Sequence, residues 1–453
     1  MNYGIWTLVP VIVIIVMAIV TKKSFEALLI GSVVASIIMY GAGFLPHWVS
    51  ALTDAAADPG NQWVFLVCGL FGSLIAMLRE SRGTNGFARW GEKICKSERT
   101  ALLGTCIMGA VIFVDDYLNM LTVGTCMRKI CDKRKVPRES LAYVLDSTGT
   151  PVCVLLPFST WTAFYISLFM KEDAIKALGF TSGIKLYIHV IPFIFYAIAT
   201  ILIVVLFSLG VMPKLGGMKK AYNRVKTTGK TYSPASEKYN VNEEEGEVPG
   251  NILDFVIPIA VLIAVTIIQG DMLLAVIVTL VVCLLLYVPR KVMTIGQWCN
   301  LLISGFCEMI PTLAILLAAF CVANCCNAMH LPEYIISTVT PFLSSWTLPV
   351  IIFIVVAILT FATSSTWGVS TIVVPIIIPL AAALNANMFL TMAAILSGST
   401  FGSHACFYSD ATVLASTASK IENLDHAGSQ MPYALIAAAI TCAGFIICGI
   451  IMM

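Results

Sequence analysis

Long apolar runs separated by short polar segments follow one another along the whole chain. Many of these runs reach the roughly 20 residues that a helix needs to cross the hydrocarbon core of a bilayer. The runs are continuous rather than alternating at every second residue, which excludes a transmembrane β-barrel. We expect full spans over residues 5–20, 25–44, 63–78, 187–209, 252–268, 272–288, 301–325 and 431–453, with a polar loop over 46–62. The pattern predicts an all-α polytopic membrane protein.

The segment 101–127 differs from these spans because basic residues flank it at both ends. Lys and Arg beside membrane segments remain in the cytoplasm, so this segment must enter the membrane and return. Its arms, 101–113 and 117–127, would each form a helix of about 17–20 Å, too short for a core of about 30 Å. We predict a re-entrant hairpin with Asp115 and Asp116 at its tip, near the bilayer midplane. A solvated turn is the alternative.

Three other segments are apolar but interrupted. They are 141–170, broken at 146–151; 347–384, two arms around 363–368; and 388–419, broken at 397–404. The two halves of the chain then share one order: three spans, an amphipathic segment (79–99 and 331–343), a hairpin, a broken span and a final span. Each half crosses five times, and an odd number inverts the second half. We predict two inverted-topology repeats, 1–210 and 251–453, joined by the polar linker 211–250.

The positions of the basic residues agree with this topology. With the first terminus outside, 24 of the 27 Lys and Arg fall in cytoplasmic segments. The three outside are Lys171, Lys176 and Lys185. If either hairpin were counted as a full crossing, the Lys and Arg would no longer divide in this way between cytoplasmic and outside segments. We therefore expect a multi-pass protein of the bacterial cell membrane, with both termini outside and the linker 211–250 in the cytoplasm.

Composition narrows the class of protein further. The chain is 59% hydrophobic and 11% charged, whereas ordinary soluble domains carry about 25% charged residues. Lys22 and Lys23 follow the first apolar run instead of preceding it, so this run is a span and not a signal peptide. The fifteen Cys form no C-x-x-C pair and are expected to be free thiols. We expect no enzyme, because Ser403 and His404 are adjacent rather than positioned for attack. No nucleic acid and no cofactor beyond coupling ions are expected.

Carboxylates at the helix breaks suggest ion chemistry. Inverted repeats bring the two hairpin tips and the two broken spans together near the midplane, where helix ends can bind charged groups. Asp115, Asp116, Asp146 and Asp410 lie in these segments, and each charge costs about 2.5–3.5 kcal/mol at a helix centre. We predict no Lys or Arg at that depth. The carboxylates must then be protonated or bind a cation, and alternation between the two states is cation/proton exchange.

The candidate site combines these carboxylates with nearby hydroxyl, amide and aromatic side chains. The predicted substrate- and ion-binding residues are Asp115, Asp116, Asn119, Asp146, Ser147, Thr148, Thr150, Ser159, Trp161, Ser364, Ser365, Thr366, Trp367, Ser399, Thr400, His404, Ser409 and Asp410. Asp116, Asp146 and Asp410 are the hypothetical sodium ligands.

Several of these residues also have structural interpretations. Asp146 can cap the following half-helix, since Asp-Ser-Thr is a good capping sequence. Asp410 can be a cap or an interfacial residue, and His404 can be a buried histidine with satisfied hydrogen bonds. Trp161 and Trp367, like Tyr165, can be packing residues rather than a ligand wall. Glu308 can be a structural or protomer-contact residue or a second proton site.

The chain resembles the NhaC family of sodium/proton antiporters, within the larger ion transporter superfamily that includes sodium–dicarboxylate symporters. The motifs that carry this resemblance are Phe113-Val-Asp-Asp-Tyr, Leu145-Asp-Ser-Thr-Gly-Thr-Pro-Val-Cys, Pro157-Phe-Ser-Thr-Trp, Ser365-Thr-Trp-Gly and Phe401-Gly-Ser-His with Ser409-Asp-Ala-Thr. The resemblance covers nearly the whole chain. It implies a sodium/proton antiporter in a lipid bilayer, with an elevator-type movement and a homodimeric assembly.

The resemblance also implies a division into a fixed scaffold and a mobile transport domain. We assign residues 5–78, 187–209, 252–325 and 431–453 to the scaffold, and residues 101–170 and 347–419 to the transport domain.

One departure from the family pattern opens an alternative function. Many members have Gly-Asp-His where this chain has Gly402-Ser403-His404, so a carboxylate is missing. The first tip carries two Asp, whereas the second, around Ser364, is uncharged. A zwitterion could place its ammonium at the first tip and its carboxylate at the second. The alternative is a sodium- or proton-coupled carrier of a small zwitterionic or anionic substrate, an amino acid or a carboxylate.

Overall fold

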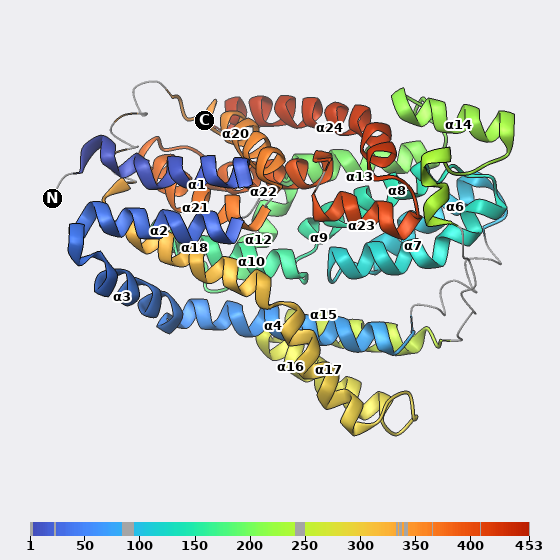
Figure 1. Ribbon diagram of the computed structural model, residues 1–453, viewed down its shortest axis with the longest axis horizontal. Coiled ribbons are helices and arrows are strands. Elements are labelled where there is room, and N and C mark those ends of the chain that lie inside the picture. The colour runs from blue at the N-terminus through green and yellow to red at the C-terminus, as the bar shows by residue number, and fades with distance from the viewer. Residues whose placement is uncertain are drawn as a thin grey trace.

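The computed structural model describes residues 3–21, 24–83, 95–240, 250–331, 334, 338, 343–364, 366–407 and 409–452. Every regular element in these ranges is a helix, and they contain no strand. Most helices run along the long axis of the molecule (Figure 1). Four helices are long and apolar enough to cross a membrane, or up to seven if each bent pair counts as one span. The fold is therefore that of a polytopic membrane protein, as predicted.

The helices of the first half follow the predicted order. They are α1 (Leu8–Thr21), α2 (Ser24–Tyr40), α3 (Phe44–Ala57), α4 (Pro59–Glu80), α6 (Glu98–Val111), α7 (Asp116–Lys133), α8 (Arg138–Thr148), α9 (Thr150–Leu155), α10 (Thr160–Phe169), α11 (Asp173–Lys176), α12 (Gly183–Val190) and α13 (Phe195–Ser208). The predicted span 187–209 is bent by 58° between α12 and α13. The linker contributes α14 (Gly216–Thr228).

The helices of the second half follow the linker. They are α15 (Leu253–Gln269), α16 (Met272–Tyr287), α17 (Ile295–Glu308), α18 (Ile310–Ala328), α20 (Leu348–Thr363), α21 (Thr366–Ala383), α22 (Met388–Ala405), α23 (Asp410–Ser419) and α24 (Asn423–Ile451). The span predicted over 301–325 is two helices, α17 and α18, which meet at a bend of 44°. The predicted amphipathic segments 79–99 and 331–343 lie largely outside the described residues.

The polar loop expected over residues 46–62 is wrong, because most of this segment is helical. α3 runs to Ala57, and α4 begins two residues later at Pro59. The Asp58 carboxylate caps α4 by accepting a hydrogen bond of 2.9 Å from the Asn61 N–H. Proline is favoured at a first helical position, so Asp58-Pro59 marks a helix start rather than a loop.

Of the two predicted helix breaks, the one in the second half needs correction. α22 continues through Ser397–His404 and ends at Ala405, and α23 begins at Asp410. In the first half the break predicted over 146–151 is confirmed, because α8 ends at Thr148 and α9 begins at Thr150. A further bend of 44° falls between α9 and α10, before Thr160. A seryl or threonyl hydroxyl in a buried helix can bond to the carbonyl four residues earlier, as Thr400 does to Leu396 at 2.7 Å. Runs of Ser, Thr and Gly therefore stay helical here.

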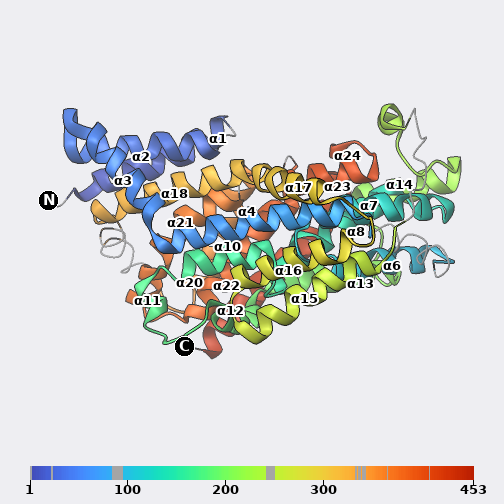
Figure 2. The same ribbon diagram turned by 90° about the horizontal axis from the view of Figure 1, so that it is seen from below.

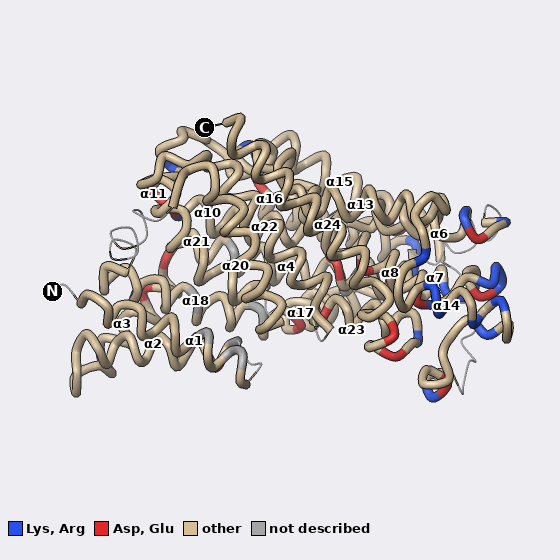
Figure 3. The backbone as a smooth tube through the Cα atoms, turned by 90° about the horizontal axis from the view of Figure 1, so that it is seen from above, with Lys and Arg blue, Asp and Glu red and all other residues tan. Residues whose placement is uncertain are grey.

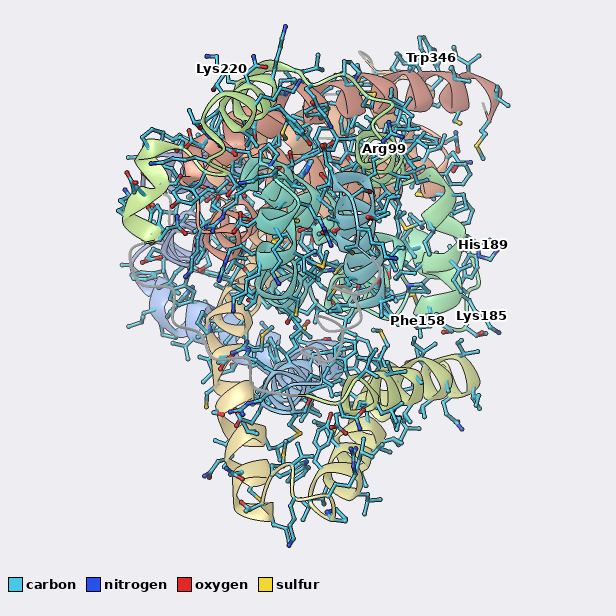
Figure 4. All side chains as sticks on the ribbon, turned by 90° about the vertical axis from the view of Figure 1, so that its right-hand side faces the viewer. Arg99, Phe158, Lys185, His189, Lys220 and Trp346 are labelled. Atoms are coloured by element: carbon cyan, nitrogen blue, oxygen red, sulfur yellow. The ribbon has the colours of Figure 1, made fainter. Side chains whose placement is uncertain are left out.

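The helices pack as two groups. The first group contains α1–α4 and α15–α18, and the second contains α6–α13 and α20–α24. In Figure 4, viewed along the long axis, α4 and the yellow helices α15–α17 lie below most of the second group. The groups meet where α10 packs on α4 and where α21 packs on α18 (Figure 2). α24 packs on α13, α22, α14 and α8, and α13 packs on α9, α22 and α6.

The charged residues divide between the two ends of the molecule. Lys and Arg gather at the end formed by α6, α7 and α14, while few lie at the opposite end, near α11 (Figure 3). Ion pairs at the basic end are partly buried, including Arg138–Asp132 and Arg224–Glu139, both at 2.8 Å. The long middle part carries few charges (Figure 3), as expected of an integral membrane protein.

Candidate functional site

A cavity of about 540 Å³ lies between the two helical groups. Residues from both hairpin tips, from the starts of α10 and α23, and from α4, α17 and α18 line it. They are Gly72, Ile75, Arg79, Asp115, Asp116, Tyr117, Thr160, Trp161, Glu308, Met309, Pro311, Ile315, Thr363, Ser364, Thr366, Trp367, Asp410 and Val413. The two tips and the starts of α10 and α23 thus meet at one cavity, whereas its described lining includes no residue of the predicted breaks 146–151 and 397–404.

Asp115 shapes the first tip as the capping residue of α7. Its carboxylate accepts hydrogen bonds from the backbone N–H groups of Tyr117 and Leu118, at 3.0 and 3.1 Å. The Thr160 hydroxyl donates to the other carboxylate oxygen at 3.1 Å, and the Thr160 N–H donates to the Val114 carbonyl. These bonds hold the tip against the start of α10. Asp115 is therefore a structural cap as well as a charge on the cavity wall.

Asp116 faces the cavity from the first turn of α7 and is 5% exposed. The Thr150 hydroxyl, at the start of α9, donates to its carboxylate at 2.8 Å. The Trp161 indole lies close to this carboxylate, but its N–H makes no hydrogen bond of ordinary geometry. One neutral donor does not balance a buried carboxylate, so Asp116 retains the capacity to bind a cation or a proton.

Asp410 reaches the cavity from the first turn of α23. Its carboxylate accepts a hydrogen bond from the Tyr117 hydroxyl, which joins the first tip to the second interrupted span. The cap of α23 is Ser409 and not Asp410, because the Ser409 hydroxyl accepts from the Thr412 N–H at 3.2 Å. The alternative that Asp410 is the helix cap is therefore wrong, and its side chain is left to face the cavity.

Ser159 and Ser409 occupy equivalent positions at the starts of α10 and α23. The Ser159 hydroxyl donates to the Cys153 carbonyl at 2.6 Å and accepts from the Thr162 N–H at 3.2 Å. The Ser409 hydroxyl does the same with Ser403 and Thr412, at 2.6 and 3.2 Å. Both serines are fully buried, so they fix the local backbone rather than face the cavity.

The second tip presents hydroxyl and aromatic groups. Ser364 ends α20 with a positive φ of 55°, and Thr366 begins α21. Ser365 lies outside the described residues. The Trp367 ring lies 5.7 Å from that of Trp161 and 4.1 Å from that of Phe164, between ring centroids. Trp161 and Trp367 are thus both packing residues and part of the cavity wall.

A basic residue also lines the cavity. Arg79, at the end of α4, forms an ion pair of 3.6 Å with Glu308, at the bend between α17 and α18. The expectation that no Lys or Arg reaches the site is therefore wrong. The long Arg79 side chain extends from the helix end, beyond what its position in the sequence indicates. Because Glu308 offsets Arg79, the carboxylates of Asp115, Asp116 and Asp410 still leave the lining with excess negative charge.

The remaining predicted residues lie behind the cavity, inside the second helical group. Asn119 donates to the carbonyls of Gly109 and Thr148, at 2.6 and 3.2 Å, and ties α7 to α6 and α8. Ser399 is within 3.0 Å of the Ser370 hydroxyl. Thr148 and Thr400 bond to carbonyls of their own helices.

His404 is a buried histidine with both ring nitrogens satisfied. Its Nε2 lies 3.0 Å from the Ser147 hydroxyl, and its Nδ1 lies 2.8 Å from the Tyr196 hydroxyl. The side chain is fully buried. These contacts join α22 to α8 and α13. They support the structural interpretation of His404, a buried histidine with satisfied hydrogen bonds.

Asp146 lies in the last turn of α8 and caps no helix, so the capping interpretation is wrong. It is fully buried, and its Oδ2 atom accepts from Thr412, His426 and Gln430 at 3.3, 3.0 and 2.8 Å. Asp146 is thus separated from Asp116 and Asp410, which line the cavity. Among the described residues, no group of three or more His, Cys, Asp or Glu side chains could hold a metal ion.

Sequence reasoning missed Arg79, Tyr117, His426 and Gln430. The last two lie near the start of α24 and are one helical turn apart, so they share a helix face. Two such polar residues at the start of an apolar helix were a signal that this face is buried against polar groups. For Tyr117, the sequence offered no indication of a site residue beyond its position next to Asp116.

A second cavity of about 930 Å³ is lined by residues of α11, the helix near the end with few basic residues. Asp54, Asn61, Asn327, Lys171 and Glu172 are among its lining residues, which again come from both helical groups. Burial, with a smaller effect of the neighbouring Asp173 carboxylate, raises the pKa of Glu172 to about 7. Burial lowers the pKa of Lys171 to about 8. The Lys171 Nζ also lies 3.4 Å from the centroid of the Phe320 ring.

Comparisons with known proteins agree with this architecture. The sequence profile of the Na+/H+ antiporter family matches residues 152–450. A protein of Haemophilus influenzae without an assigned function is 27% identical over 485 aligned positions, which cover 98% of this chain and 91% of that protein.

Two solved structures have the same kind of fold. One is MtrF of Neisseria gonorrhoeae, described as illuminating a class of antimetabolite efflux pumps, with a TM-score of 0.60, 12% identity and coverage of 96% of this chain and 94% of that one. The other is the YdaH transporter of Alcanivorax borkumensis, with a TM-score of 0.58, 12% identity and coverage of 91% and 90%.

Proposed function

The chain belongs to the Na+/H+ antiporter family and is a secondary transporter rather than an enzyme, and we propose that it exchanges sodium ions for protons. Asp116 and Asp410 are the exchanging groups in this proposal, and each alternates between a cation-bound and a protonated state. Asp115, Ser364 and Thr366 contribute the further oxygen atoms of the cavity. The protein resides in the cell membrane, with the basic end and the linker in the cytoplasm.

The observation that carries this proposal is the charge of the cavity wall. Asp115, Asp116 and Asp410 face one space, and the only basic side chain among the described lining residues is Arg79, which pairs with Glu308. Carboxylates between apolar helices are stable only when a cation or a proton neutralises them. A site that must hold one or the other suits an antiporter, because each ion leaves when its competitor binds.

The proposed movement carries the site across the membrane between two inverted repeats. Each tip would be a re-entrant hairpin, and α6–α13 with α20–α24 would form the mobile unit. This division includes α12, α13 and α24 in the mobile unit, unlike the one expected from sequence, because they pack on α9 and α22. The group α1–α4 with α15–α18 would be the scaffold and would form the homodimer contact. The cavities of about 540 and 930 Å³ would be the two ends of the pathway.

The size of the cavity favours a second candidate function. A volume of about 540 Å³ is far larger than a sodium ion and falls within the range of small-molecule sites. The rings of Trp161 and Trp367 lie beside the carboxylates, an arrangement that can bind an ammonium group by charge and by cation–π contact. Arg79, which lines the same cavity from α4, could receive a carboxylate. The second candidate is therefore a sodium- or proton-coupled carrier of a small zwitterion.

Thermal stabilisation of the purified protein distinguishes the two candidates. A ligand at 100 times its dissociation constant adds about 2.7 kcal/mol to the stability of the folded state. We expect sodium chloride to raise the unfolding temperature, with choline chloride as the control for ionic strength. Stabilisation by an amino acid that depends on sodium would instead support the second candidate. No sodium-specific stabilisation at all would contradict sodium/proton exchange and the sodium-coupled form of the second candidate.

A further inference from the structure

The side chains around Asp146 leave several buried polar atoms without hydrogen bonds. Asp146 and His426 are fully buried, and Gln430 is 1% exposed. Asp146 Oδ1, His426 Nδ1 and Gln430 Oε1 all lack a hydrogen-bond partner. Most buried polar groups are satisfied, and a group of three unsatisfied atoms in one contact network calls for a bound water or ion.

The hydrogen bonds determine which of these atoms are acceptors. Gln430 Nε2 donates to Asp146 Oδ2 at 2.8 Å and also to the His404 carbonyl. These two acceptors fix the orientation of the amide, so Oε1 is the free atom. Thr412 and His426 donate to the same Asp146 oxygen. Every donor thus converges on Oδ2, while Oδ1 and Gln430 Oε1 remain as oxygens that need a donor or a cation.

The charges around Asp146 also favour a bound cation. Among the ion pairs of the described residues, its one partner is His426, which is charged only when it is protonated. Tyr196, His404 and Asp410 are the other titratable groups that act on this cluster, and none of them brings a permanent positive charge. A fully buried carboxylate with neutral partners is costly, and a bound cation removes that cost.

We propose that Asp146, Gln430 and His426 form a second sodium site, separate from the cavity. Asp146 Oδ1 and Gln430 Oε1 are its ligand atoms, and His426 orients the carboxylate through Oδ2. Thr412 connects this site to the cavity, because it bonds to Asp146 and accepts from Ser409, the residue before Asp410. The proposal rests on the proposed function in one respect, since it takes the protein to be sodium-coupled.

Equilibrium binding of radioactive sodium to the protein in nanodiscs tests this site. The double variant Asp116→Asn with Asp410→Asn removes the two carboxylates proposed to exchange ions in the cavity and should still bind sodium. Adding Asp146→Asn should abolish the remaining binding. Gln430→Met, which removes Oε1 at similar volume, should weaken it by at least about tenfold. Asp271→Asn, a matched change at an exposed helix cap, should have no effect on binding.

The outcomes separate this inference from the proposed function. If the double variant binds no sodium while wild type does, the buried oxygens hold water, and the inference fails while the function stands. If wild type itself binds no sodium, the proposed function fails as well. The unfolding temperature of each variant in choline chloride shows whether it is folded. Should Asp146→Asn not fold, Gln430→Met in the double-variant background decides, since unchanged sodium binding there overturns the second site.

Discussion

The Tyr117 hydroxyl donates a hydrogen bond to the Asp410 carboxylate, across two segments almost three hundred residues apart in sequence. It joins the first tip to α23 directly at the cavity. Tyr117→Phe removes this donor and leaves the rest of the side chain in position. Hydrogen bonds to charged groups contribute about 1.5–3 kcal/mol, so we expect the apparent sodium affinity to change by tenfold or more. Sodium-dependent transport at a series of sodium concentrations measures this change.

Tyr40→Phe is the matched control for this substitution. Tyr40 stacks on His47 far from the cavity, and its ring contact does not need the hydroxyl. Its transport should equal that of wild type. Equal affinities in Tyr117→Phe and Tyr40→Phe would show that the Tyr117–Asp410 bond has no role in ion binding.

Asp115 and Asp116 should respond differently to the same chemical change. Asp116→Asn removes the carboxylate that faces the cavity and should abolish exchange. Asp115→Asn keeps a capping side chain, since Asn caps helices as well as Asp, and should retain the fold and part of the activity. Exchange rates in proteoliposomes that contain equal amounts of each variant provide the comparison.

Asp115→Ala completes the comparison by removing the cap itself. We expect it to lose about 1 kcal/mol of stability, measured by thermal unfolding, whatever its transport rate. Full exchange by Asp116→Asn would remove this residue from the mechanism, and full stability of Asp115→Ala would contradict its capping role.

The contact between α4 and α17 depends on two glycines. A Cβ atom on Gly72 would lie 2.3 Å from the Gly305 carbonyl oxygen and 2.4 Å from Met309 Cγ. Because backbone must move to admit it, Gly72→Ala should destabilise the protein by about 1–3 kcal/mol. Gly428→Ala meets no atom within 4 Å and should cost nothing. Thermal unfolding of both variants tests this, and equal stabilities would mean that α4 and α17 do not pack this closely.

Glu172 gives the stability a defined pH dependence. Its pKa of about 7 in the folded protein exceeds its ordinary value of 4.5, so the folded state binds more protons between these values. Stability must then fall as pH rises from 4.5 to 7, and the full loss of folding stability is present above pH 7. Glu172→Gln should raise the stability at pH 8 by about 1–3 kcal/mol and leave it unchanged at pH 4. A difference from wild type that is the same at both pH values would contradict this account.

Sequence alone could predict the helices and the meeting of the interrupted segments, but not the exact positions of the interruptions. Apolar length and flanking charge located the arms α6 and α7, and the Asp pair between them does line the cavity. The sequence predicted a break over Ser397–His404, but this segment is part of α22. In the structure, tertiary burial and hydroxyl bonds such as Thr400 to Leu396 keep it helical.

Sequence patterns could not predict the side-chain contacts that depend on how distant helices pack. Asp146 could be recognised as a buried carboxylate, but its contacts with His426 and Gln430 depend on how α24 packs on α8. Arg79 was expected in a cytoplasmic segment, yet it lines the cavity together with Asp115 and Asp116. Both cases show that a side chain's depth depends on packing as well as on its position in the chain.

Proton movement driven by sodium in proteoliposomes tests the central claim most directly. Purified protein is reconstituted with a pH-sensitive dye inside the vesicles, and sodium is then added outside. We predict that the lumen becomes more alkaline as sodium enters and protons leave, that choline gives no signal, and that Asp116→Asn abolishes the response. Sodium uptake with no change in luminal pH, in vesicles that hold a pH gradient, would contradict sodium/proton exchange.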